Sequence, residues 1–222
     1  MSERVIMMTD DGVEIVGTFV APVHATHAVL CLHMMPADRA SWHAVQTMLA
    51  EHGIASLAID LRGHGESVRM AERRLDYLLF GEIEHQESRL DLLAASAWLR
   101  TCGFSTDRLG VIGASIGANL ALQFAGEESR IPAVALLSPG ENYRGIFTLP
   151  AAARLRDPQA LLVVASSDDE ASCVASRELV EQARIADKTL LLLENAGHGT
   201  RMFDAKGDLL TNVVDWFVER LK

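Results

Sequence analysis

A serine stands between two glycines in the run Gly113-Ala114-Ser115-Ile116-Gly117. The apolar segment 109–112 before it has the pattern of a buried strand, and the segment 118–125 after it is rich in helix-forming residues. Glycines beside the serine let the backbone turn sharply from strand to helix, which pushes the hydroxyl outward. The first amides of the helix then face the place where a carbonyl oxygen would become negative. The pattern predicts a nucleophilic serine at Ser115.

A serine hydroxyl is a weak nucleophile at neutral pH and needs a general base. His198 lies between two glycines, directly after the apolar strand pattern of residues 190–193. Asp168 follows another such pattern, residues 161–165. We expect His198 to take the proton of Ser115 and Asp168 to orient the imidazole. The chain order serine, aspartate, histidine is one of several orders in which such triads occur.

Two other carboxylates compete with Asp168 for the acid role. Asp169 is its immediate neighbour, and Glu141 follows the preceding strand pattern. Asp168 is favoured because it lies three residues beyond Ala165, where the loop can lean towards the histidine.

The developing negative charge on a substrate carbonyl needs two amide donors. The first expected donor is the N–H of Ile116, directly after the nucleophile. The second is expected in the loop that follows the strand ending at His33, from Met34 or Met35.

Apolar runs and helical patterns alternate along most of the chain. Strands are predicted at residues 27–33, 54–60, 109–112, 133–137, 161–165 and 190–193, and helices at 39–52, 84–101, 118–125, 151–155, within 172–187, and at 208–221. Residues 4–8 and 13–20 flank Asp10-Asp11-Gly12 and predict an N-terminal β-hairpin. We therefore expect the α/β class, with a mostly parallel central sheet covered by helices on both faces, in one domain over residues 1–222.

The stretch between residues 137 and 160 has room for about one short helix. No large cap is expected, so the site should be open and bounded by the 151–155 region and the segment 67–83.

Composition limits the partners that this chain can have. Its 222 residues carry 20 basic and 30 acidic side chains, a net charge of −10, which argues against nucleic acid or an anionic membrane as partner. Three distant cysteines (Cys31, Cys102 and Cys173), no signal-peptide pattern and no apolar run of about 20 residues predict a cytoplasmic protein. The expected partner is a small molecule, with no cofactor and no metal.

These motifs together resemble the α/β-hydrolase superfamily over almost the whole chain, and within it the small capless serine hydrolases that include bacterial carboxylesterases and dienelactone-hydrolase-like proteins. The matching pieces are Leu32-His33 with Ser41-Trp42, Asp60-x-Arg62-Gly63-His64-Gly65-x-Ser67, Gly113-x-Ser115-x-Gly117, the acid loop at Asp168, and Gly197-His198. The resemblance implies hydrolysis of short or medium carboxylic esters through an acyl-enzyme. Met34 and Ala165 depart from it, since many relatives have glycine at both positions.

Other activities were weighed against ester hydrolysis. Thioester hydrolysis uses the same parts, and a ligand sensor that retains the fold without turnover also stays open. A nucleotide-binding oxidoreductase is rejected because neither Tyr77 nor Tyr143 is followed four residues later by lysine. The glycine-rich run 60–67 lacks the lysine and spacing of a phosphate-binding loop, and we expect a structural turn in which Asp60 and Arg62 bond to the backbone.

Overall fold

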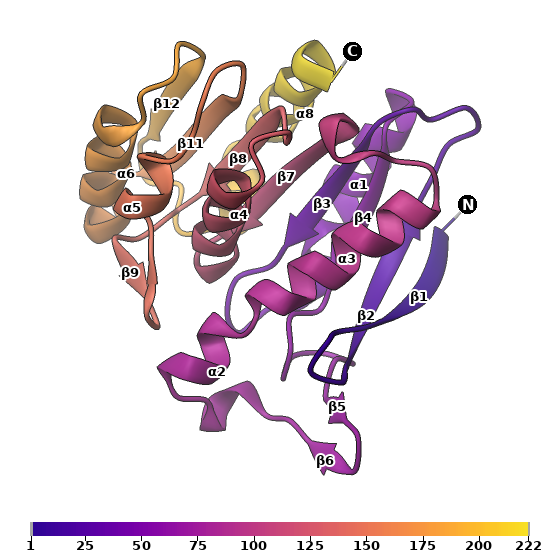
Figure 1. Cartoon of the computed structure of the whole chain (residues 1–222). Coiled ribbons are helices and arrows are strands. Elements are labelled where there is room, and N and C mark those ends of the chain that lie inside the picture. The colour runs from indigo at the N-terminus through magenta and orange to yellow at the C-terminus, as the bar shows by residue number, and fades with distance from the viewer. Residues whose placement is uncertain (1, 222) are drawn as a thin grey trace.

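The computed structural model describes residues 2–221, and a ten-stranded sheet runs through its centre (Figure 1). Six neighbouring strands are parallel, in the order β12-β11-β8-β7-β3-β4. Their bounds are β3 Ala28–Leu32, β4 Ala55–Ile59, β7 Leu109–Ala114, β8 Ala133–Leu137, β11 Ala160–Ser166 and β12 Lys188–Leu193. The predicted mostly parallel sheet is confirmed, with strand ends that differ from the predicted ones by a few residues.

The N-terminal strands extend the sheet beyond β4. The predicted hairpin is present, since β1 (Ser2–Met8) pairs with β2 (Val13–Val20) in antiparallel register. The strand β2 also pairs with β4 and with the two-residue strand β5 (Arg69–Met70), which is followed by β6 (Arg73–Arg74).

Helices cover both faces of the sheet, as predicted. One face packs on α3 (Arg89–Thr101), α4 (Ile116–Glu127) and α6 (Glu170–Gln182), and the other on α1 (His43–Glu51) and α8 (Leu209–Leu221). The apolar side chains of the parallel strands point alternately into these two cores, which explains why the strands are continuously apolar rather than alternating. No helix within residues 2–221 is long and apolar enough to cross a membrane.

The helix predicted over residues 84–101 is two helices. A short helix α2 (Glu82–Gln86) ends before α3 begins at Arg89. The break has a packing reason, because Asp91 in the first turn of α3 is fully buried and accepts hydrogen bonds from Arg62, from its backbone N–H at 2.8 Å and from its Nε at 2.9 Å. This ion pair fixes α3 on the turn that follows β4, while α2 diverges from the sheet (Figure 1).

The segment between β8 and β11 holds a two-stranded hairpin and one short helix. The hairpin consists of β9 (Asn142–Tyr143) and β10 (Ile146–Phe147), and the helix α5 spans Leu149–Ala152. The hairpin was not predicted, because two-residue strands give no periodic signal.

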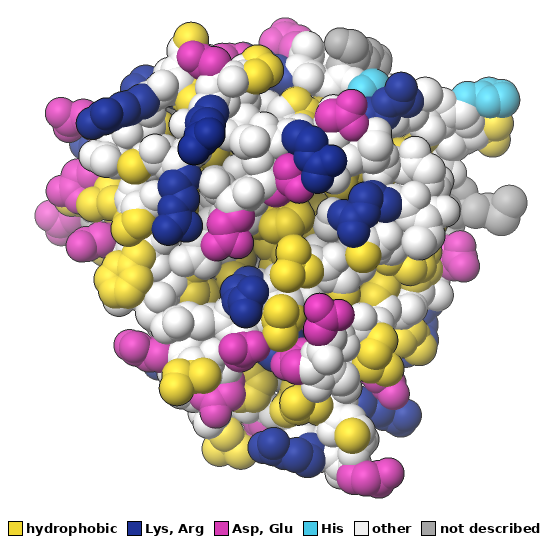
Figure 2. Space-filling model, in the orientation of Figure 1, with side chains coloured by type: hydrophobic (Ala, Val, Ile, Leu, Met, Phe, Trp, Pro, Cys, Tyr) yellow, Lys and Arg dark blue, Asp and Glu magenta, His cyan; other side chains and the backbone are white. Residues whose placement is uncertain are grey.

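Apolar side chains are exposed on α2 and on the residues just before it. Leu78, Leu79 and Ile83 are each about three-quarters or more exposed. Figure 2 shows hydrophobic side chains among charged ones on the lower half of this face.

Candidate active site

Ser115 lies between β7 and α4 in a backbone conformation that non-glycine residues seldom adopt. Its φ is 54° and its ψ −119°, a cost of about 1–3 kcal/mol that the surrounding packing must offset. A Cβ on Gly113 would lie 2.0 Å from the carbonyl oxygen of Gly117, and a Cβ on Gly117 would lie 2.4 Å from that of Leu32. Both glycines are therefore required by close backbone contacts. The predicted sharp turn is present, with the half-buried serine at its apex.

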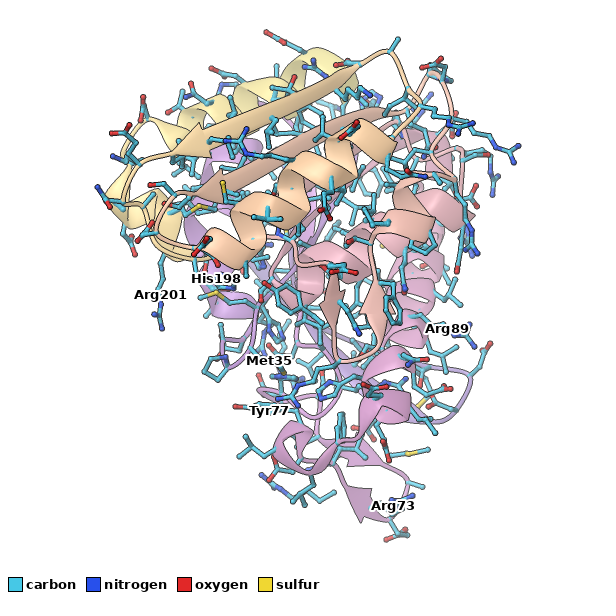
Figure 3. All side chains as sticks on the ribbon, turned by 90° about the vertical axis from the view of Figure 1, so that its left-hand side faces the viewer. Met35, Arg73, Tyr77, Arg89, His198 and Arg201 are labelled. Carbon is cyan, nitrogen blue, oxygen red and sulfur yellow. The ribbon has the colours of Figure 1, made fainter. Side chains whose placement is uncertain are left out.

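The loops after β3, β7, β8 and β12 converge around this turn. A Cβ on Gly199 would lie 2.4 Å from Met34 Sδ and 3.5 Å from Ala114 Cβ, so the histidine loop rests on both neighbouring loops. The N–H of Gly199 also donates to Ser138 Oγ, at 2.9 Å, beyond the end of β8. In Figure 3, Met35 lies below His198.

His198 is paired with the carboxylate of Asp169. Its Nδ1 lies 2.6 Å from Asp169 Oδ2, and the two side chains are 35 % and 18 % exposed. Because a carboxylate accepts, Nδ1 carries the proton, which leaves Nε2 free to act as a base.

The prediction that Asp168 orients His198 is wrong. Asp168 accepts hydrogen bonds from the Ser166 hydroxyl and, at 3.2 Å, from the N–H groups of Ala196 and Gly197. The hydrogen bond from Ser166, with those from the two amides, holds the pKa of Asp168 below its ordinary value. Asp168 thus joins the acid loop to the histidine loop.

The cause of the error lies in the end of β11. The strand continues past Ala165 to the fully buried Ser166, and a turn closed by the Asp169 N–H on the Ser166 carbonyl, at 2.9 Å, follows it. The turn therefore brings the carboxylate of Asp169, one residue beyond Asp168, to the imidazole of His198. Glu141, the other rival, is exposed before β9 and does not contact His198.

Tyr143, which the sequence reasoning did not assign to the site, lies close to the histidine. Its ring centroid is 6.5 Å from that of His198, with the two planes at 84°. Among the described residues, Ser115 and His198 share no direct hydrogen bond; such contacts often tighten only when substrate binds. A hairpin signal in Tyr143-Arg144-Gly145-Ile146 was the available clue to this residue.

The loop with the expected second amide donor is held by a buried histidine. His33 Nε2 accepts from the Leu61 N–H at 2.9 Å, so Nδ1 must carry the proton that it donates to the Met34 carbonyl at 3.0 Å. Burial lowers the pKa of His33 to about 4, and the ring is neutral near pH 7. Within residues 2–221, the N–H groups of Ile116 and Met35 donate to no other protein group.

The glycine-rich run 60–67 is a structural turn. The expectation for Asp60 is met, since its carboxylate accepts from the backbone N–H groups of Arg39 and Glu66, both at 2.8 Å. For Arg62 the expectation is wrong, because its guanidinium pairs with the carboxylates of Asp91 and Asp11.

No group of three or more histidine, cysteine, aspartate or glutamate side chains within residues 2–221 is arranged to hold a metal ion.

Comparison with solved structures shows the fold. A dienelactone hydrolase from Anabaena variabilis matches with a TM-score of 0.72 and 21% identity, over 99% of this chain and 96% of that one. An esterase from Pyrococcus furiosus matches with a TM-score of 0.81 and 20% identity, over 100% and 92%. Est1E from Butyrivibrio proteoclasticus, solved with ferulic acid, matches with a TM-score of 0.75 and 20% identity, over 98% and 99%.

No curated protein matches the sequence of this chain. The family model described as alpha/beta hydrolase fold matches residues 27–168, which hold the serine turn and most of the parallel sheet. The chain therefore belongs to the alpha/beta hydrolase fold family.

Proposed function

We propose that this protein is a serine hydrolase of carboxylic esters, with Ser115 as nucleophile, His198 as base and Asp169 as the orienting acid. The observation that carries the proposal is the 2.6 Å contact between His198 and Asp169, next to a strained serine turn. An imidazole held by a carboxylate near a serine hydroxyl is the arrangement that activates a serine.

Acylation follows from this arrangement. Nε2 of His198 takes the proton of Ser115 as Oγ bonds to the substrate carbonyl carbon, and the resulting imidazolium is stabilised by Asp169. The N–H groups of Ile116 and Met35 are the proposed donors to the oxyanion, and the neighbouring Met34 is buried. His198 then protonates the departing alcohol, which leaves an acyl-enzyme.

Deacylation reverses these roles with water. His198 takes a proton from water, the hydroxide attacks the acyl carbon, and the proton returns to Ser115 Oγ as the acid leaves. The steps need no group beyond the chain and water.

The substrate class is supported by two observations. Two of the structurally similar proteins are named a dienelactone hydrolase and an esterase, and a third was solved with ferulic acid bound. These names and this ligand all point to carboxylic esters or acids. Between β8 and β11 the chain has a hairpin and one short helix instead of a long insertion, which leaves the serine side open. We therefore propose short or medium, water-soluble acyl groups rather than emulsified lipid.

A panel of p-nitrophenyl esters with two to twelve acyl carbons, together with matched thioesters, tests this function. We expect steady turnover that is fastest for the shorter chains and absent in Ser115→Ala, with a fluorophosphonate probe attached at Ser115. Turnover that persists in Ser115→Ala would overturn the assignment, and binding without turnover would favour a ligand sensor. Faster cleavage of thioesters would place the natural substrate among acyl thioesters.

A further inference from the structure

The strand β12 differs from the other parallel strands in its exposure. Every residue of β3, β4, β7, β8 and β11 is buried, whereas no residue of β12 is. Among the described residues β12 pairs only with β11, at the outer end of the sheet, so its other edge meets no strand (Figure 1). Four consecutive leucines, residues 190–193, are therefore partly exposed along an open sheet edge.

Backbone groups that point out of this edge alternate with groups that bond to β11. The Leu193 carbonyl accepts from the Ser167 N–H, which follows β11, at 2.8 Å. Because the backbone groups of successive residues in a strand point to opposite sides, the odd-numbered residues of β12 face β11. The N–H and C=O groups of Lys188, Leu190 and Leu192 therefore point away from the sheet.

An open edge of this kind is a template for a further strand. Proteins commonly protect such edges with charged side chains, proline or bulges. The edge strand β1 is protected in this way, since the exposed Glu3 and Arg4 lie within it. The strand β12 has a charged residue only at its first position, so its edge from Thr189 to Leu193 is unprotected.

The two ends of β12 carry opposite charges. Lys188 is its first residue, and the exposed Glu194 follows its last. The Lys188 ammonium donates to two carbonyls near the end of α6, at 2.9 and 2.6 Å, and has a third proton for a carboxylate. The neighbouring Asp187 is paired with Arg220 at 2.9 Å, so the first end of the strand presents a positive charge. The strand is thus complementary in charge to its own reversed copy.

We propose that β12 pairs with β12 of a second copy of this chain, antiparallel, about a two-fold axis at Leu191. In this register Lys188 lies opposite Glu194 of the second copy, and the symmetry repeats the pair at the other end. Leu190 lies opposite Leu192, and both have outward backbone groups, so the hydrogen bonds between the copies form without a change in β12.

The charges select this register over its neighbours. A shift by two residues in either direction would retain the backbone pairing, but it would place Lys188 and Glu194 opposite apolar residues. In the proposed register the partly exposed leucines gain cross-strand neighbours, and Leu191 meets its own copy at the axis. The two ten-stranded sheets become one continuous sheet.

Charge exchange at the two ends of β12 tests the dimer and its register. Wild type, Lys188→Glu and Glu194→Lys are compared by sedimentation velocity, with Glu51→Lys, at the exposed end of α1, as the matched control. We expect wild type and Glu51→Lys at about twice the chain mass of 24.2 kDa. Each of the other two variants alone places like charges opposite each other at both ends and should associate about 10- to 100-fold more weakly. An equimolar mixture of these two should regain the dimer, because lysine again meets glutamate at both ends.

Leu192→Pro gives a second test that does not depend on Lys188, whose contacts with α6 also affect folding. Proline removes an outward N–H and leaves the hydrogen bonds to β11 in place, so a folded monomer is expected, with Tm recorded for every variant.

Three results would overturn the proposal. A wild-type protein that stays at 24.2 kDa at every concentration would refute the dimer and leave the edge to another partner, such as an extended peptide. A dimer that persists in folded Glu194→Lys and Leu192→Pro would place the contact between copies on a different surface. Weakened single variants whose mixture stays monomeric would refute the register.

Discussion

Replacement of Asp169 by asparagine should abolish most of the catalytic activity without unfolding the protein. The carboxylate lies 2.6 Å from Nδ1 of His198, where it fixes the proton on that nitrogen. An amide can instead turn its NH₂ towards Nδ1, which favours the tautomer with the proton on Nε2. That tautomer cannot accept the proton of Ser115, and the charged imidazolium also loses its partner.

The size of the effect follows from the exposure of the pair. Removal of the charge from a buried triad acid costs up to about 10⁴-fold in turnover. Here the side chains of Asp169 and His198 are 18 % and 35 % exposed, so water can replace part of the lost interaction. We expect a loss of about 10²- to 10³-fold in kcat, or about 3 to 4 kcal/mol at 1.36 kcal/mol for each factor of ten.

Asp168→Asn is the matched control because it changes the neighbouring carboxylate in the same loop. Its side chain retains an oxygen that can accept from the Ser166 hydroxyl, and it makes no contact with His198. We expect kcat within about five-fold of wild type. The assay is steady-state hydrolysis of p-nitrophenyl acetate, with Tm recorded for each variant. Folded variants with the reverse ranking, Asp168→Asn inactive and Asp169→Asn active, would refute the reasoning.

Two further predictions concern stability. Gly113→Ala should lower the free energy of unfolding by about 1–3 kcal/mol in urea titration, since its methyl would lie 2.0 Å from the Gly117 carbonyl oxygen. Gly207→Ala, with open space around the new methyl, should stay within about 0.5 kcal/mol, and equal effects of the two would contradict the close contact. Asp168 has a lowered pKa in the folded protein, so its contribution to stability is present above about pH 4 and is lost as the pH falls through its folded pKa. The Tm difference between wild type and Asp168→Asn should therefore shrink below about pH 4, and a difference that grew there would refute the sign.

The fold was largely predictable because the parallel strands are buried on both faces. Their continuous apolar runs are bounded by glycines and polar residues, and helical patterns fill the intervals. The break between α2 and α3 was not predictable, because it depends on the buried pair of Arg62 and Asp91, which are distant in sequence. The hairpin at Tyr143 was missed because its strands are too short for a periodic pattern.

The site was predictable where local backbone demands set it. The turn at Ser115 needs its two glycines, and the spacing of those residues is visible in the sequence. The choice between Asp168 and Asp169 depends instead on how far β11 continues and how the next turn closes. If β11 ended one residue earlier, the other carboxylate would face His198, and no local sequence pattern indicates where the strand ends.

The hydrogen bonds of Asn119 and Asp168 brace the loops of the candidate site in two separate places. Asn119, in the helix that follows Ser115, holds the hairpin that carries Tyr143, while Asp168 ties the loop of His198 to the loop that carries Asp169. Thermal motion will therefore change the distances within each braced part less than the distance between Ser115 and His198. The proton must cross that distance. Ser138 connects the histidine loop to the end of β8, because its Oγ accepts a hydrogen bond from the Gly199 N–H. Heating would then slow proton transfer from Ser115 to His198, because the two side chains lose their alignment before the loops that carry them unfold.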